Sequence, residues 1–396
     1  MSIERAYLDW NATAPLRPEA REAMLAALDE IGNPSSVHRE GRRARALVED
    51  ARHGVARLVG ARAPEVIFTS GGTEANNMAL SLPWKRLLVS AVEHDSVLAP
   101  ARRSGAEVVV LPVDANGVVV AEAVARALSD VVEPATTLLS LQMANNETGV
   151  IQPLAEIAAA AKAAGITVHA DAVQAAGRMP IDLDALRLDL MSISGHKLGA
   201  PKGVGALIVR DGVDVRPLLA GGGQEGRRRA GTENVAGIAG FGAAARVARE
   251  ELGLFADLVE RRRAIEAVIM STVPESAIVG VRAERLANTV CFTWPGASAE
   301  TLLIKLDLAG VAVSSGAACS SGKVGPSHVL AAMGLTEDES RSALRVSFGA
   351  ATDDRAFERF FAVLAAVANR TTGQPVAMGN QPGGPASRHE MMMGEA

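Results

Sequence analysis

Cysteine is scarce in this chain, since its 396 residues include only Cys291 and Cys319. Two thiols cannot form the disulfide framework that stabilises many secreted domains, so a reducing compartment is favoured. No uncharged apolar run reaches the roughly 18 residues that a membrane-spanning helix needs. The first eleven residues include Glu4, Arg5 and Asp9 and lack the apolar core of a signal peptide. These absences predict a cytoplasmic protein without a membrane segment.

Positive charge is not in excess either, because the formal net charge is −5 at pH 7. Proteins that bind nucleic acid through its phosphates normally present a surplus of lysine and arginine. The three arginines at positions 227–229 form only a local cluster, which we interpret as charges of a site or an interface. We therefore expect no direct binding of nucleic acid.

Short apolar runs alternate with longer amphipathic segments through the first half of the chain. This alternation is typical of an α/β fold in which helices cover a mostly parallel sheet. A seven-stranded sheet is predicted, because the runs occupy residues 66–69, 87–90, 108–111, 138–141, 166–169, 190–193 and 206–209.

The pattern changes in the second half, where one long helical stretch, residues 241–273, precedes shorter elements. We expect a large domain over residues 16–258 and a smaller α+β domain formed by residues 1–15 with 259–370. Residues 371–396 are rich in Gly, Pro, Asn and Met without periodicity, which predicts a disordered tail. Its consecutive methionines are interpreted as incidental, and no metal site is predicted.

A glycine-rich turn follows the first apolar run and opens a predicted helix. Residues 70–77 include Gly71, Gly72 and Thr73. Glycines let the backbone approach an anion, and a helix N-terminus offers N–H groups and a favourable dipole. The segment is a candidate phosphate loop, to which Thr73 adds a hydroxyl. A capped strand-to-helix turn without a ligand is the alternative.

Two ionisable residues end later strands at the same predicted sheet edge. Asp171 ends a buried strand, where a carboxylate needs a partner such as a protonated pyridine nitrogen. Lys197 ends the next strand, beside Ser194 and His196, and could form a Schiff base with an aldehyde cofactor. Taken singly, Asp171 also suits a structural cap and Lys197 a surface lysine. Because ligands bind at the carboxyl ends of parallel strands, the three segments together predict a pyridoxal 5'-phosphate (PLP) site.

Further ordered blocks occur from residue 7 to residue 349, at 7–9, 32–38, 92–96, 145–149, 221–225 and 231–234. In composition and order they resemble the class V aminotransferase family, and more narrowly the cysteine desulfurases. The likeness extends to the long-loop group of these enzymes, the nitrogen-fixation and iron–sulfur-cluster type. It implies the PLP-dependent transferase fold type I, with a large domain around the sheet and a smaller α+β domain.

The resemblance implies roles around the cofactor ring. Lys197 would be the Schiff-base lysine, and Asp171 would pair with the ring nitrogen. Gln174 would contact the ring hydroxyl. His94 would stack on the ring face and move protons, acting with Lys197 as acid and base.

The resemblance also implies how the phosphate and the substrate are held. Thr232 would reach the site from the neighbouring subunit of a homodimer. Asn146 and Arg345 would hold the substrate carboxylate, which a guanidinium binds bidentately. An interdomain salt bridge is the alternative for Arg345. Within one subunit, the residues placed at the phosphate are Gly72, Thr73, Ser194 and His196.

The two cysteines have contrasting neighbours. Cys291 lies between Val290 and Phe292, which indicates a core residue. Cys319 lies in a small, polar, glycine-rich segment, residues 313–328, which is typical of an exposed loop. Only a thiolate is nucleophilic, and exposure favours it. The resemblance implies that Cys319 receives the sulfur.

The implied reaction takes sulfur from L-cysteine, giving L-alanine and a persulfide on Cys319. Acceptor proteins, such as an iron–sulfur scaffold, would then take the sulfur for cluster assembly or other transfer. A selenocysteine lyase or an aminotransferase is an alternative, and Cys319 argues against the aminotransferase. A catalytically weak, PLP-bound assembly scaffold is a further alternative. It would show damage to the catalytic set, and none is visible in the sequence.

Overall fold

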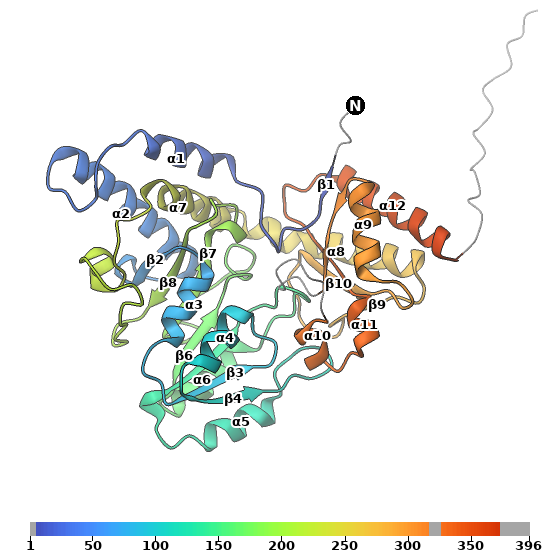
Figure 1. Ribbon diagram of the computed structural model, residues 1–396, viewed down its shortest axis with the longest axis horizontal. Helices are drawn as coiled ribbons and strands as arrows, with labels where there is room; N and C mark the ends of the chain where they lie inside the picture. Colours follow the sequence, from blue (N-terminus) through green and yellow to red (C-terminus); the bar gives the residue numbers. More distant parts are fainter. Residues whose placement is uncertain (1–4, 317–325, 373–396) are drawn as a thin grey trace, which may run out of the picture.

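The computed structural model describes residues 5–316 and 326–372. Cys319 and the part of the predicted tail from residue 373 onward lie outside these residues. The chain forms a large sheet with helices on both faces and, beside it, a smaller sheet with its own helices (Figure 1). The α/β class predicted from the sequence is confirmed.

The large sheet has seven strands in the order β2-β8-β7-β6-β5-β3-β4. Its strands are parallel except β8, which runs antiparallel to both neighbours. Each of the seven apolar runs forms one strand, so the predicted mostly parallel sheet is confirmed. The strands are β2 (Val66–Thr69), β3 (Arg86–Ser90), β4 (Glu107–Leu111), β5 (Thr137–Gln142), β6 (Thr167–Asp171), β7 (Leu190–Ser194) and β8 (Gly205–Val209).

Alternate side chains of each strand enter different cores, because successive residues of a strand point to opposite faces. In β2, Val66 and Phe68 belong to one buried cluster and Ile67 to another. The helices α3 (Gly72–Leu80) and α4 (Asp95–Arg103) pack in the cluster of Ile67. The other face is covered by α1 (Pro18–Leu28), α2 (Arg39–Val59), α5 (Ala121–Ser129), α6 (Leu154–Ala163) and α7 (Val235–Glu250).

The smaller sheet has four antiparallel strands in the order β12-β13-β10-β9. Leu8 near the N-terminus is buried in the same core as Phe292, Trp294 and Phe360. A separate pair joins β1 (Ala6–Tyr7) to β11 (Val311–Ala312). The strands are β9 (Ala277–Ile278), β10 (Thr289–Thr293), β12 (Ser314–Ser315) and β13 (Leu344–Ser347), and the helices are α8 (Leu252–Thr272), α9 (Ala299–Leu308), α10 (His328–Ala332), α11 (Glu337–Arg341) and α12 (Asp354–Thr372).

The single helical stretch expected over residues 241–273 is wrong, because Glu251 separates α7 from α8. The carboxylate of Glu251 accepts a hydrogen bond from Arg17 Nη1 at 2.6 Å. The two helices also bury their apolar residues in different cores, Phe241 with the large sheet and Phe255 with the small one. A periodic sequence pattern shows that residues are helical, but it does not reveal in which of two cores their apolar side chains are buried.

No helix in the described part of the chain is both long enough and apolar enough to span a bilayer.

Candidate active site

A cavity of about 680 Å³ opens at the carboxyl ends of β2, β6 and β7. All of the predicted site residues line it except Thr232, which is exposed, and Cys319, which lies outside the described residues. The sequence therefore located one common site. The predicted residues that line the cavity are Gly72, Thr73, His94, Asn146, Asp171, Gln174, Ser194, His196, Lys197 and Arg345.

The candidate phosphate loop brings the N-terminus of α3 against the ends of β6 and β7. A Cβ on Gly72 would lie 2.7 Å from Val173 Cγ2 and 3.3 Å from Ser194 Cβ, so glycine permits the close approach. Gly205 plays a similar part, because its Cβ would lie 2.7 Å from the Gly71 backbone. Gly71, Gly72 and Thr73 line the cavity, so the N-terminus of α3, whose first N–H groups have no acceptor within the helix, lies at its wall.

Asp171 ends β6 and is 6% exposed. Its Oδ1 accepts a hydrogen bond from the Val173 N–H at 2.9 Å, and its Oδ2 accepts one from Asn76 Nδ2 at 2.8 Å. Both of these donors are neutral. Among the described residues, the carboxylate therefore has no cationic hydrogen-bond partner, which suits pairing with a protonated ring nitrogen in the cavity.

His94 caps the N-terminus of α4. Its Nδ1 accepts a hydrogen bond from the Ser96 N–H at 3.0 Å and lies 2.8 Å from Ser96 Oγ. Burial is the main cause that lowers the pKa of His94, and the nearby charge of Lys197 lowers it further. The ring is consequently neutral near pH 7, with Nδ1 as acceptor and the hydrogen on Nε2.

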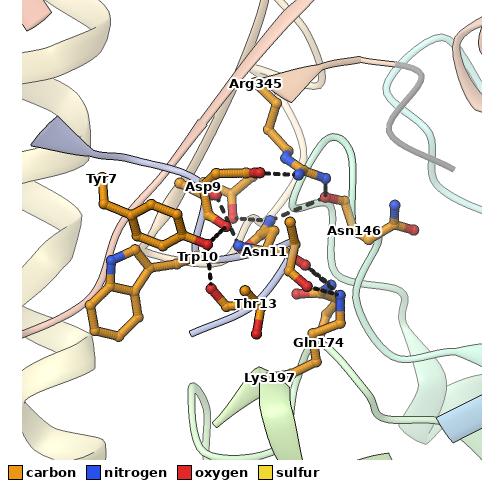
Figure 2. Close-up of polar contacts among 12 residues, drawn as sticks. Tyr7, Asp9, Trp10, Asn11, Thr13, Asn146, Gln174, Lys197 and Arg345 are labelled. Carbon is orange, nitrogen blue, oxygen red and sulfur yellow. Dashed lines mark hydrogen bonds and ion pairs between the residues drawn. The ribbon is translucent and has the colours of Figure 1, made fainter. Parts of the chain in front are cut away.

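Lys197 ends a 3-10 turn, η3 (Gly195–Lys197), directly after β7. Its Nζ donates to the carbonyl oxygens of Asn11 at 2.6 Å and Ala12 at 3.0 Å (Figure 2). Burial lowers the pKa of the neighbouring His196 to about 4, with a further contribution from the Lys197 charge. The His196 ring is therefore a neutral hydrogen-bonding group beside the lysine.

Arg345 lies on β13 of the small sheet and is 1% exposed. Its Nη2 forms an ion pair with Asp9 Oδ1 at 2.7 Å, and its Nη1 donates to the Asn146 carbonyl at 2.9 Å. Within the described residues, its Nε has no hydrogen-bond partner. The guanidinium thus forms a salt bridge and also lines the cavity, so it retains donor capacity for a carboxylate ligand.

Two residues of the hydrogen-bond network beside the cavity, Asn11 and Arg178, were not predicted from the sequence. The carbonyl of Asn11 accepts from Gln174 Nε2 at 3.1 Å, and its Oδ1 accepts from Arg178 Nη1 at 2.7 Å. Burial, helped by the charge of Arg345, lowers the pKa of Arg178 to about 9. The four-residue spacing of Gln174 and Arg178 was an available signal. The only sequence signal for Asn11 was its position two residues after Asp9, close to a block of sequence to which no role was assigned.

Glu147, next to Asn146, is another buried acid at the site. Burial raises its pKa to about 7, although a hydrogen bond from Ser327 and the charge of Arg345 oppose the rise. Ser327 is the N-cap residue of α10, a helix on the same side of the molecule as the small sheet (Figure 1). Glu147 therefore joins the segment of Asn146 to the part of the chain that follows residue 326.

Comparison with protein families and relatives gives a consistent result. The chain matches the family described as aminotransferase class-V over residues 6–360. It belongs to this family. It is 43% identical over 355 residues to the cysteine desulfurase IscS of Dictyoglomus turgidum, covering 87% of this chain and 89% of that protein. It is 44% identical over 378 residues to a cysteine desulfurase of Cereibacter sphaeroides, covering 91% and 95%.

Solved structures agree with these sequence relatives. The NifS-like protein from Rickettsia africae matches with a TM-score of 0.85 and 34% identity, covering 93% of this chain and 100% of that one. The structure of SspA in complex with cysteine matches with a TM-score of 0.74 and 30% identity, covering 87% and 98%. The predicted resemblance to cysteine desulfurases is confirmed, and so is the fold that it implied.

As a class V family member the protein is a PLP-dependent enzyme. The residues present fit this cofactor. The glycine cradle at α3 suits an anionic phosphate, Asp171 suits a ring nitrogen, and Lys197 supplies an amine inside the same cavity.

Proposed function

We propose that this protein is a cysteine desulfurase, which removes sulfur from L-cysteine and releases L-alanine. The observation that carries the proposal is the meeting of Lys197, Asp171 and Arg345 in one cavity, in a chain that belongs to the class V family. The similarity to curated cysteine desulfurases and to a relative solved with cysteine supports the choice of substrate.

The cofactor would be held from both ends. Asp171 would pair with its ring nitrogen, Gln174 would contact its ring hydroxyl and His94 would lie on its ring face. When bound, PLP withdraws electrons from the α-carbon of the amino acid attached to it. The phosphate would be bound by the N-terminus of α3 with Gly72, Thr73, Ser194 and His196.

The substrate carboxylate would bind Arg345 and Asn146. The guanidinium of Arg345 is already oriented by its ion pair with Asp9, so little side-chain entropy is lost when a ligand binds. Because Arg345 is buried, its charge acts in a medium of low polarity, where a carboxylate is attracted more strongly than in water.

Two groups would move protons in the reaction. Lys197 would exchange a proton at Nζ, which the Asn11 and Ala12 carbonyls hold inside the cavity. His94 would deliver the proton on Nε2, while the lone pair of Nδ1, which accepts hydrogen bonds from Ser96, takes one up in exchange. Both positions are compatible with general acid–base catalysis.

Cys319 would take the sulfur. Its thiolate attacks the substrate sulfur, a sulfur–sulfur bond forms, and the bond from sulfur to the substrate β-carbon breaks. The electron pair of that bond stays with the carbon, which is protonated to give alanine. The persulfide would then pass its outer sulfur to an acceptor, such as an iron–sulfur scaffold protein.

The site would be completed in a homodimer, with Thr232 reaching the partner's phosphate. Thr232 is exposed and does not line the cavity of its own subunit. The segment before it is fixed by Glu225, whose carboxylate accepts hydrogen bonds from Arg52 at 2.7 and 2.9 Å and from the Phe68 N–H at 3.0 Å. An exposed residue on a well-anchored segment suits a role across a subunit interface.

The domain limits are part of the same proposal. Residues 16–258 would form the unit that binds PLP, and residues 1–15 with 259–370 the unit that carries the Cys319 segment. The burial of Leu8 with Phe292 and Phe360 supports the assignment of the N-terminal residues to the second unit.

The test is incubation of the PLP-loaded protein with L-cysteine and a reductant, with alanine and sulfide measured for wild type, Cys319→Ala and Cys291→Ala. We expect equal amounts of alanine and sulfide from wild type and loss of both in Cys319→Ala. Cys291→Ala is the matched control, because burial raises the pKa of that thiol to about 12 and makes it unreactive.

Two results would contradict the proposal. The absence of alanine from a PLP-loaded wild type would exclude a desulfurase. Formation of 3-mercaptopyruvate, with conversion of an added 2-oxo acid into its amino acid, would indicate an aminotransferase instead. A parallel assay with selenocysteine separates a selenocysteine lyase, which would act on selenocysteine far faster than on cysteine.

A further inference from the structure

Asn76, in the second turn of α3, connects two parts of the site. The residue is completely buried. Its Nδ2 lies 2.8 Å from Asp171 Oδ2 and 2.8 Å from Ser96 Oγ, and Ser96 Oγ lies 2.8 Å from His94 Nδ1. One amide group therefore lies between the proposed partner of the PLP ring nitrogen and the hydroxyl that touches the proposed acid–base histidine.

The orientation of the Asn76 amide is fixed by Asp171. A carboxylate oxygen only accepts hydrogen bonds, so the atom that faces it must be the nitrogen. An amide nitrogen carries two hydrogens, and each serves one of the two acceptors. The reversed amide would place Oδ1 against the Asp171 carboxylate, where two acceptors repel each other.

The same orientation sets the direction of the next hydrogen bond. Ser96 Oγ accepts a hydrogen from Asn76, so its own hydrogen points to His94 Nδ1. The Ser96 N–H donates to the same nitrogen at 3.0 Å. Because both groups donate to Nδ1, they stabilise the neutral ring that carries its hydrogen on Nε2, and they disfavour protonation of Nδ1.

The Asn76 side chain does not satisfy all of its own hydrogen-bonding capacity. Within the described residues, its Oδ1 is buried and has no hydrogen-bond partner. A buried carbonyl without a partner costs stability, and such groups in native proteins are few. Packing alone does not explain a buried amide with an unpaired oxygen. A need for the two N–H donors of this amide does explain it.

We propose that Asn76 is a positioning residue, which holds the Asp171 carboxylate and orients the Ser96 hydroxyl so that His94 Nδ1 only accepts. The proposal rests on the function proposed above, in which Asp171 and His94 serve PLP and the substrate. Asn76 acts through these residues and does not itself touch reacting atoms. The proposed positioning role has two parts, one at Asp171 and one at His94. Different variants remove these two parts.

The variants are Asn76→Leu, which removes both donors and keeps the branched shape with a larger side chain, and Ser96→Ala, which removes only the branch to His94. The first readout is the protonation midpoint of His94. It is measured by NMR of the full-length holoenzyme labelled with ¹⁵N-histidine, and the His94 signals are identified by their absence in His94→Gln. We expect the midpoint to rise in both variants, because Ser96→Ala loses the hydroxyl that donates to Nδ1 and Asn76→Leu loses the amide that orients this hydroxyl. The charged or titratable groups that also act on His94, namely Asp171, Lys197, Asp95 and His328, are unchanged in sequence.

The buried ring of His169 is an internal control in the same spectra. It lies 2.8 Å from Ser140 Oγ and 2.9 Å from Ser192 Oγ, and neither hydroxyl is altered. Its signals should be the same in wild type and both variants. A change at His169 would show that a variant disturbs the fold, and Ser96→Ala then remains as the milder test.

The second readout is the rate at which the holoenzyme loses PLP after dilution. Asn76→Leu should lose PLP about tenfold faster, since a hydrogen bond to a charged group is removed from Asp171. Ser96→Ala should lose PLP at the wild-type rate. The two variants thus separate the Asp171 branch from the His94 branch.

An unchanged His94 midpoint in both variants, or equal PLP release from the two, would overturn the proposal. Neither readout requires desulfuration to occur. If the enzyme failed to form alanine while the His94 midpoint and PLP release responded as expected, the proposed reaction would be wrong and the positioning role of Asn76 would stand.

Discussion

The cavity has two walls that are built differently. One wall comes from the edge of the large sheet, where Asp171 accepts hydrogen bonds from neutral donors, the Val173 N–H and the Asn76 amide. The other wall comes from the N-terminal segment and β13, where the buried Arg345 forms an ion pair with the half-buried Asp9 across 336 positions of sequence (Figure 2). The hydrogen bonds to Asp171 at the first wall come from neutral groups, whereas the second wall is held by an ion pair.

This difference suggests a division of work. A carboxylate with only neutral partners retains its attraction for a cationic ring, so the first wall suits a tightly held cofactor. A guanidinium that shares its charge with Asp9 binds an incoming carboxylate without being neutralised by it. The second wall therefore suits a substrate that must also leave.

The largest effect is expected at Lys197, where the two walls meet through its contacts with Asn11 and Ala12. Lys197→Ala should lower the turnover of L-cysteine by about 10²–10⁴-fold, the usual range for a lost acid–base group. Alanine formation and the PLP absorption spectrum are the measurements. A turnover within threefold of wild type would exclude Lys197 from the reaction.

Arg345→Gln should weaken the charged wall alone. We expect the KM for L-cysteine to rise roughly 10- to 100-fold, since the hydrogen bonds lost are to a charged group, while the rate of PLP release stays near wild type. Arg345→Lys, which keeps the charge but not the bidentate geometry, should recover part of the loss. A fall in kcat without a change in KM would contradict substrate binding by Arg345.

Asn11→Ala tests how much the charged wall contributes to stability. The change leaves the buried Arg178 without its Oδ1 partner and removes the donors to Asn146 and Thr289. The free energy of unfolding should fall by about 2–3 kcal/mol, measured from urea midpoints. The exposed Asn33→Ala should cost less than about 1 kcal/mol and serves as the control. Equal effects of the two changes would show that the network is not structural.

The last effect depends on pH and concerns Glu147, whose folded-state pKa is raised from 4.5 to about 7. Between these values the unfolded chain releases the proton and the folded protein keeps it, so the stability from this group falls as pH rises from 4.5 to 7. Glu147→Gln removes this dependence. Relative to wild type, the free energy of unfolding of the variant should increase by up to about 1.4 kcal/mol per pH unit across this window. Above the window the difference should stay constant. A constant difference from pH 4.5 to 7 would contradict a raised pKa.

Much of the first wall could be predicted because its signals are short in sequence. The glycine turn after β2, Asp171 and Lys197 each follow an apolar run, and parallel strands bring their carboxyl ends to one edge. The second wall could not be predicted in this way. Asp9 was visible only as part of a motif, and its partner Arg345 lies on a separate antiparallel strand whose position depends on the packing of the small core.

The sequence by itself determined the seven-stranded α/β fold, the family and many of the residues at the cavity, because each of these depends on local periodicity or on a short ordered motif. Only the tertiary structure decided that Arg345 pairs with Asp9, that Asn11 holds Lys197, and that Asn76 joins Asp171 to Ser96. It also decided the break at Glu251 between α7 and α8. These features depend on which side chains meet across the core, and that is set by the packing of many distant residues at once.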